Sequence, residues 1–154
     1  ATARLKAKGI DAMGHRENFC LIAEDLSERK LVDVLKTNES WDQSARTVII
    51  AEGLLMYLPP EAVRDLFSQC DLITGVGSRI AFSYIPSGTD GRLDAGRWTG
   101  LMLWLQKVAG EPWLWSIHPD KLGPFLAETG WKNDSEEVWL KQKYGVEFYA
   151  KAAK

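Results

Sequence analysis

The stretch Thr47-Val-Ile-Ile-Ala51 is a short, continuous run of mostly β-branched residues, and Glu52 and Gly53 follow it at once. Such a run is typical of a strand that is buried on both faces, as in a parallel sheet. Pro60 and Glu61 then open a helix, because proline is tolerated in the first helical turn and a carboxylate favours the positive end of the helix dipole. The order of strand, polar turn and helix therefore predicts an α/β unit.

The same alternation extends in both directions from this unit. Apolar spacing and β-branched content predict strands at 19–23, 78–85, 138–144 and 146–150, and helices at 3–8, 27–35, 92–108 and 120–130. The last two strands are expected to pair as an antiparallel hairpin about Gly145. Together these elements predict one α/β domain over residues 1–154, with a mainly parallel sheet and helices on its faces.

Composition excludes several classes of protein. The 154 residues are 45% hydrophobic and 26% charged, which is ordinary for a globular domain with a real core. The 19 basic and 21 acidic residues give a net charge of −2 without a basic tract, which argues against nucleic acid as a partner. Glu52 and Gln106 interrupt the longest apolar stretches, so we expect no membrane span.

The cysteines and histidines show no metal-binding spacing. Cys20 and Cys70 lie in apolar runs and are expected to be free core thiols of a cytoplasmic protein. His15 and His118 are isolated, so no metal site is predicted. His118 is either a general base or, the interpretation we favour, the residue that begins the helix at Pro119.

Two of the expected strands end on an acid, Asp25 and Glu52. The carboxyl ends of parallel strands meet at one edge of a sheet, where ligands of such sheets bind. Asp25 either accepts hydrogen bonds from a ligand or caps the next helix. We expect Glu52 to be buried and to need a partner, which is a cationic ligand or else Arg46 or backbone amides. Gly53 allows a ligand close to the backbone, although a simple turn explains it as well.

Aromatic residues near this edge also have two interpretations. Tyr57 either points its hydroxyl into the cleft or belongs to the core with its hydroxyl at the rim. Four of the seven tryptophans, Trp98, Trp104, Trp113 and Trp115, lie close together. They form either a lid over a substrate pocket or the contact that holds a helix on the sheet.

The segment Ala51-Glu-Gly-Leu-Leu-Met-Tyr-Leu-Pro59 resembles the signature of the leucine carboxyl methyltransferase family. The resemblance extends to the segments 21–26, 77–82, 111–115 and 125–131. Bacterial members of this family are S-adenosylmethionine-dependent O-methyltransferases, many of them associated with polyketide biosynthesis. The resemblance implies a Rossmann-like class I methyltransferase fold and S-adenosylmethionine as cofactor. It also implies contacts of Asp25 and Leu26 with the adenine, and a methyl-donor cleft lined by Glu52, Gly53 and Tyr57.

The chain also departs from the family pattern. The family's glycine-rich loop after the first strand, and the acid that ends the second strand, have no counterpart in the sequence. Gly75-Val-Gly77 follows a helix and precedes a strand, so it is expected to be a turn and not the cofactor loop. The chain therefore resembles the carboxyl-terminal portion of the enzyme, without the first strands. We expect the resulting open edge to pair with a companion amino-terminal segment or with a second copy in a homodimer.

The function expected from the resemblance is methyl transfer to a carboxylate or hydroxyl of a small molecule. A carboxylate acceptor is already ionised, whereas a hydroxyl acceptor needs a base, for which Glu52, Tyr57 and His118 are the candidates. Glu52 and Tyr57 are the catalytic residues we predict. The alternative is a truncated or degenerate module that mediates protein contacts, which the missing loop favours. A third possibility is a nucleotide-binding oxidoreductase of similar architecture. It needs the same missing loop and explains the segment 52–58 no better.

Overall fold

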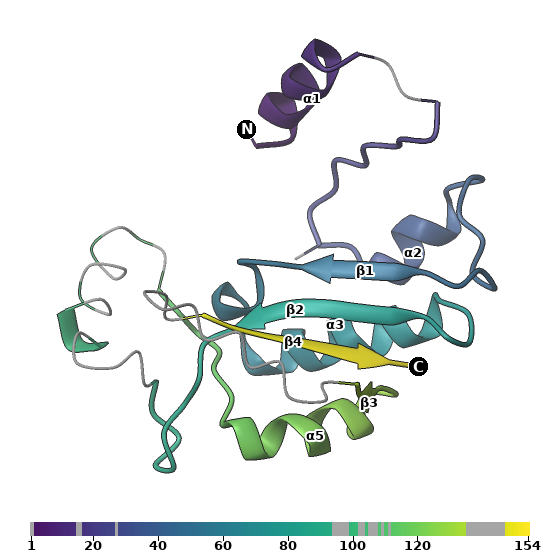
Figure 1. Cartoon of the computed structure of the whole chain (residues 1–154). Helices are drawn as coiled ribbons and strands as arrows, with labels where there is room; N and C mark the ends of the chain where they lie inside the picture. The colour runs from purple at the N-terminus through teal and green to yellow at the C-terminus, as the bar shows by residue number, and fades with distance from the viewer. Residues whose placement is uncertain are drawn as a thin grey trace.

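The computed structural model describes residues 2–14, 17–26, 28–93, 99–101, 104, 108, 110, 112–134 and 147–154. In chain order its elements are α1 (Thr2–Ala12), α2 (Leu31–Lys36), β1 (Val48–Ala51), the 3-10 helix η1 (Leu55–Tyr57), α3 (Pro60–Leu72), β2 (Arg79–Tyr84), α5 (Pro119–Glu128), β3 (Lys132–Asn133) and β4 (Phe148–Ala153). Figure 1 shows the strands side by side, with α3 and α5 below them and α1 on the other side. The expected unit of a strand near 47–51 followed by a helix from Pro60 is present as β1 and α3, and the α/β class is confirmed.

The four described strands form one mixed sheet in the order β1-β2-β4-β3. β1 and β2 are parallel, whereas β4 is antiparallel to both β2 and β3. The expectation of a mainly parallel sheet is therefore wrong for the described residues, because segment 19–23 adds no parallel strand. β4 confirms the expected antiparallel strand near the end of the chain, but it lies between β2 and β3. The expected strand at 138–144 lies outside the described residues.

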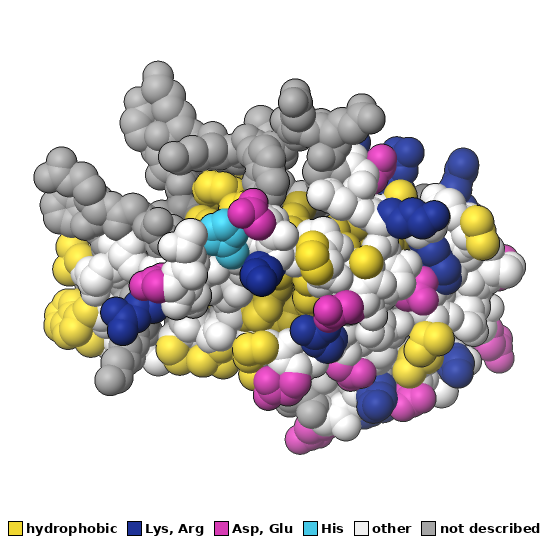
Figure 2. Space-filling model, turned by 90° about the horizontal axis from the view of Figure 1, so that it is seen from below, with side chains coloured by type: hydrophobic (Ala, Val, Ile, Leu, Met, Phe, Trp, Pro, Cys, Tyr) yellow, Lys and Arg dark blue, Asp and Glu magenta, His cyan; other side chains and the backbone are white. Residues whose placement is uncertain are grey.

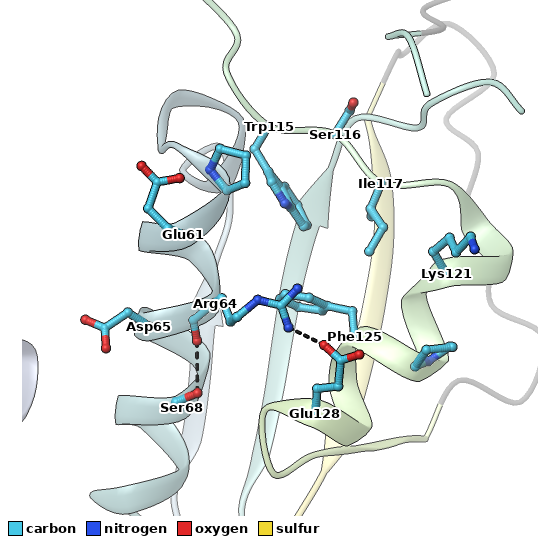
Figure 3. Close-up of a pocket in the computed structure, with 12 residues that line it drawn as sticks. Glu61, Arg64, Asp65, Ser68, Trp115, Ser116, Ile117, Lys121, Phe125 and Glu128 are labelled. Atoms are coloured by element: carbon cyan, nitrogen blue, oxygen red, sulfur yellow. Dashed lines mark hydrogen bonds and ion pairs between the residues drawn. The ribbon is translucent and has the colours of Figure 1, made fainter. Parts of the chain in front are cut away.

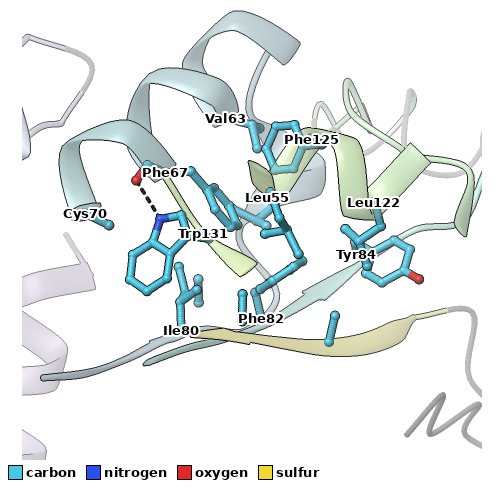
Figure 4. Close-up of a cluster of buried hydrophobic side chains, with 14 of the residues drawn as sticks. Leu55, Val63, Phe67, Cys70, Ile80, Phe82, Tyr84, Leu122, Phe125 and Trp131 are labelled. Atoms are coloured by element: carbon cyan, nitrogen blue, oxygen red, sulfur yellow. Dashed lines mark hydrogen bonds between the residues drawn. The ribbon is translucent and has the colours of Figure 1, made fainter. Parts of the chain in front are cut away.

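The core lies between the sheet and the two helices α3 and α5. Alternation along β2 turns Ile80, Phe82 and Tyr84 toward these helices, and all three are buried. Phe67 of α3 packs edge-on against Phe82 and Phe125, with ring centroids 5.0 and 5.1 Å apart. Figure 4 shows these side chains filling the space between the two layers. This packing fixes the direction of β1 and β2, and with it the edge where both strands end.

The opposite face of β1 is exposed. Val48 and Ile50 are 68% and 75% exposed, whereas Ile49 packs against the core and Ala51 is buried within it. The expectation of a strand buried on both faces is therefore wrong for the described part of the chain. β1 is an edge strand there, and α3 covers only one of its faces. A continuous β-branched run predicts the strand, but it does not reveal which neighbours cover it.

The amino-terminal segment differs most from expectation. α1 continues through Gly9 to Ala12, and the helix gives way to Gly14 at a φ of 90°. Residues 19–23 form no strand. Cys20 is exposed, so its assignment to the core is wrong, whereas Cys70 is buried as expected and both thiols are free. An apolar run becomes a strand only where another strand pairs with it, and none of the described strands does so here.

The remaining helices follow the sequence more closely. α2 begins at Leu31, later than expected, and α5 matches the expected helix within two residues at each end. Within the helix expected at 92–108, Leu93 is not helical, whereas the described residues from Thr99 to Val108 are helical. Gly75 to Gly77 forms the expected turn, with the Ser78 amide donating to the Gly75 carbonyl at 3.2 Å. Across the described residues, no helix has the length and apolar character that crossing a membrane requires.

Candidate functional site

The turn after β1 lies at the carboxyl end of a parallel strand pair, where the sequence predicted a ligand site. Gly53 adopts a φ of 61°, a conformation that L side chains rarely take. The Gly53 amide donates a hydrogen bond of 2.8 Å to Ser83 Oγ, on the neighbouring strand β2. A Cβ added at Gly53 would meet nothing within 4 Å, so the backbone here is open to a close approach by a ligand.

Glu52 is exposed, and its partner is a residue that the sequence did not suggest. Tyr149 Oη, from β4, donates a hydrogen bond of 3.3 Å to Glu52 Oε1. The expectation of a buried Glu52 paired with Arg46 or with backbone amides is therefore wrong. Glu52 lies one residue beyond the strand, so its carboxylate reaches water, while Arg46 precedes the strand and lies at its other end.

Tyr149 is a proton donor at neutral pH. Desolvation raises the pKa of Tyr149 above its usual value, and the negative charges of Glu52 and Glu147 and the hydrogen bond to Glu52 raise it further. The phenol therefore keeps its proton and can donate to the Glu52 carboxylate. Ser83 and Tyr149 are the site residues that sequence analysis missed. Their register pairing in the sheet brings them together, and it depends on residues 66 positions apart in the chain.

Tyr57 lies in η1, shortly after the Glu52 turn, and is 38% exposed. It lines a cavity of about 400 Å³ together with Gly110, Pro112 and Leu114. The Leu114 and Trp115 amides donate to the Met56 carbonyl at 2.6 and 3.2 Å, which fastens this connector to η1. The structure thus places Tyr57 on the wall of a small cavity near the edge of the sheet.

Asp25 and Leu26 lie in a segment outside the sheet, and both are exposed. The Asp25 carbonyl accepts hydrogen bonds from the Glu28 and Arg29 amides at 3.1 and 3.0 Å, which forms a turn before α2. Asp25 does not cap α2, whose N-cap residue is Lys30. None of the described strands includes or pairs with the segment of Asp25, so Asp25 does not end a strand of the sheet as Glu52 follows β1.

Trp115 and His118 have structural places in the fold, and the lid interpretation of the other tryptophans stays a prediction. Trp115 is buried and packs against Phe125, with ring centroids 5.8 Å apart, whereas Trp104 is 59% exposed. Trp98 lies outside the described residues. His118 is the N-cap of α5, and its Nδ1 accepts a hydrogen bond of 3.3 Å from the Asp120 amide. The interpretation of His118 as the start of that helix is confirmed.

A larger groove of about 710 Å³ lies between α3 and α5, on the covered side of the sheet. Arg64 crosses it, pairs with Glu128 and lies 5.7 Å from the centre of the Phe125 ring, as Figure 3 shows. Figure 2 shows apolar side chains in a hollow of this face, bordered by acidic and basic groups. Neither Glu52 nor Tyr57 lines this groove, so it is separate from the turn after β1.

Solved structures share the fold of this chain. PigF with SAH matches with a TM-score of 0.62 at 13% identity, over 99% of this chain and 40% of that chain. Magnesium protoporphyrin IX methyltransferase (ChlM) from Synechocystis PCC 6803, with bound SAH, matches with a TM-score of 0.56 at 12% identity, over 97% of this chain and 57% of that chain. The described sheet and helices therefore have the fold of part of a class I methyltransferase.

The sequence comparisons give matches over part of the chain. Residues 1–71 match the model of the leucine carboxyl methyltransferase family. A putative S-adenosyl-L-methionine-dependent methyltransferase of Mycobacterium sp. strain KMS is 38% identical over 73 residues, which is 42% of this chain. The match covers 24% of that relative, so the chain aligns with about a quarter of its length. The residues that match the family model include Asp25, Glu52, Gly53 and Tyr57.

Proposed function

We propose that the protein is an S-adenosylmethionine-dependent O-methyltransferase that transfers a methyl group to a carboxylate or hydroxyl of a small molecule. The main support is the Glu52-Gly53 turn. It combines an exposed carboxylate with an open left-handed glycine, at the carboxyl end of a parallel strand, in the part of the chain that matches the family. Such an edge is where α/β sheets bind their ligands.

The residues of the turn suit a cationic, nucleoside-containing cofactor. In this proposal Glu52 and Gly53 hold the methionine part of S-adenosylmethionine, and Asp25 and Leu26 contact the adenine. The Glu52 carboxylate can accept hydrogen bonds from an ammonium group, and Gly53 leaves room for the ligand beside the backbone. The cofactor supplies an electrophilic sulfonium methyl group.

The chain's own contribution to the reaction is binding and orientation. Holding donor and acceptor in a reactive geometry lowers a barrier by as much as about 7–11 kcal/mol. In our proposal Tyr57 orients the acceptor from the wall of its cavity. A carboxylate acceptor needs no base, whereas for a hydroxyl acceptor we propose that Glu52 receives the proton. His118 is a weaker candidate, because its Nδ1 already accepts a hydrogen bond from the α5 backbone.

The proposal also includes the partner of the exposed strand and the cellular location of the protein. The exposed Val48 and Ile50 on an edge strand support pairing with a companion amino-terminal segment or with a second copy. The two free cysteines agree with a cytosolic location, where thiols remain reduced. The exposed strand face also favours the second candidate function, a module that binds other proteins without methyl transfer.

Two substitutions separate these functions. We expect Glu52→Gln to abolish methyl transfer while the melting temperature stays within about 2 °C of the unchanged protein, because Glu52 is exposed. Asp25→Ala should weaken S-adenosylmethionine binding, measured by calorimetry, without loss of folding. A protein that binds no S-adenosylmethionine before any substitution would contradict the enzyme proposal and favour the binding module.

A further inference from the structure

Two hydrogen bonds from neighbouring strands hold the turn that follows β1. Ser83 of β2 and Tyr149 of β4 are register partners, so they face each other across the ladder. Ser83 accepts from the Gly53 amide at 2.8 Å, and Tyr149 donates to Glu52 Oε1 at 3.3 Å. The turn is therefore attached to the sheet at its backbone and at its side chain.

Ser83 and Tyr149 point away from the core. Their neighbours Tyr84 and Phe148 pack together on the covered face, with ring centroids 5.8 Å apart. Because successive side chains of a strand point to opposite faces, Ser83 and Tyr149 lie on the face that also carries Ile50. The Tyr149 phenol thus reaches Glu52 without contributing to the main hydrophobic core.

The hydrogen bond from Tyr149 restricts the conformations of the Glu52 side chain. A glutamate side chain has several rotatable bonds, and a donor on a rigid strand reduces that freedom before any ligand arrives. The bond occupies Oε1, and among the described residues no other side chain binds the Glu52 carboxylate. The second oxygen remains able to accept hydrogen bonds from a ligand.

We propose that Tyr149 is a positioning residue, whose phenol orients the Glu52 carboxylate to bind the cationic group of the methyl donor. The inference rests on the proposed function, and it adds a residue outside the segment that matches the family. Tyr149 acts through Glu52 and does not itself touch the ligand. Its removal should therefore weaken cofactor binding and, with a carboxylate acceptor that needs no base, leave the reaction of the bound complex intact.

A double-mutant cycle tests this role. Tyr149→Phe keeps the ring and removes the donor. We expect it to raise the Kd and the KM for S-adenosylmethionine roughly threefold to tenfold, with kcat unchanged for a carboxylate acceptor. In the Glu52→Gln background the same substitution should have no further effect on the Kd. The matched control is Tyr84→Phe, which removes a phenol from the covered face and should leave the Kd unchanged.

Titration of the phenol gives a readout that needs neither cofactor nor activity. The difference in absorbance between the unchanged protein and Tyr149→Phe isolates the ionisation of Tyr149. Glu52→Gln should lower the pKa of Tyr149 toward the usual value of 10, because it removes a negative charge that opposes the phenolate. An unchanged pKa would show that the two groups do not meet, and would overturn the positioning role.

The outcomes distinguish this inference from the proposed function. If the unchanged protein binds S-adenosylmethionine and Tyr149→Phe has no effect on its Kd, the positioning role is wrong and the proposed function stands. Equal losses in the presence and absence of the Glu52 carboxylate would also overturn it, because a purely structural tyrosine gives additive effects. If the unchanged protein binds no S-adenosylmethionine, the proposed function itself fails.

Discussion

Glu52 shows how much one residue's surroundings decide its chemistry. In the sequence it follows an apolar run and is expected to be buried. In the structure it lies one position past the strand, in contact with water and with Tyr149. Its carboxylate therefore needs no permanent cationic partner and can accept a ligand. Gly53 completes the turn with a backbone conformation that most residues avoid.

The two cysteines should differ sharply in reactivity. Burial raises the pKa of the Cys70 thiol to about 11, whereas Cys20 is exposed. The thiolate is the reactive form, so a raised pKa keeps Cys70 protonated and unreactive near pH 8. We expect a thiol reagent to modify one cysteine in the native protein and two in denaturant. Prompt modification of both in the native state would contradict the buried position of Cys70, and Cys20→Ser identifies the reactive one.

At the scale of elements, α3 is fastened to the sheet by the last residue of the chain. Lys154 Nζ donates to the Asp71 and Thr74 carbonyls at 2.5 and 2.7 Å, and lies 3.1 Å from Asp71 Oδ1. A cation at this position adds a charged donor to carbonyls at and just beyond the carboxyl end of α3, and it opposes the negative end of the helix dipole. The contact joins α3 to β4, the strand that also carries Tyr149.

Lys154→Met should therefore destabilise the fold. We expect a loss of about 1–2 kcal/mol in the free energy of unfolding, measured with urea, because partly buried carbonyls lose a charged donor. Lys151→Met is the matched control on the same strand. Its ion pair with Asp134 is 3.9 Å long and exposed, so loss of this pair should cost no more than about 0.5 kcal/mol. Equal losses for the two variants would contradict a special role of Lys154.

The sequence predicts local elements well and their neighbours poorly. β1, β2 and α5 appear within two residues of expectation, and α3 begins where expected, because their periodicity and turn residues are local properties. The predictions of a strand at 19–23 and of a buried Cys20 are wrong. Both depend on whether another strand pairs with this segment, and the local sequence pattern does not contain that information. For the same reason Glu52 and Gly53 could be predicted as site residues, whereas Tyr149 and Ser83 require the register of β2 and β4.

At the scale of the whole molecule, the described sheet has one face covered by helices, and β1 forms one of its edges. The helices α3 and α5 bury one face of the sheet, while Val48 and Ile50 remain exposed on the other face of the edge strand. The family match and the fold match cover only parts of the longer relatives. In the proposed function, this open side is where a companion segment or a second copy completes the cleft around the cofactor.

The central claim is that the turn after β1 binds the methyl donor. The most direct test is titration of isotope-labelled protein with S-adenosylhomocysteine, the demethylated product, followed through the backbone amide signals. We predict saturable shifts of the Glu52 and Gly53 amides, with little change at Ser68, which lines the groove between α3 and α5. Shifts confined to that groove, or none at Gly53 at saturation, would contradict the account.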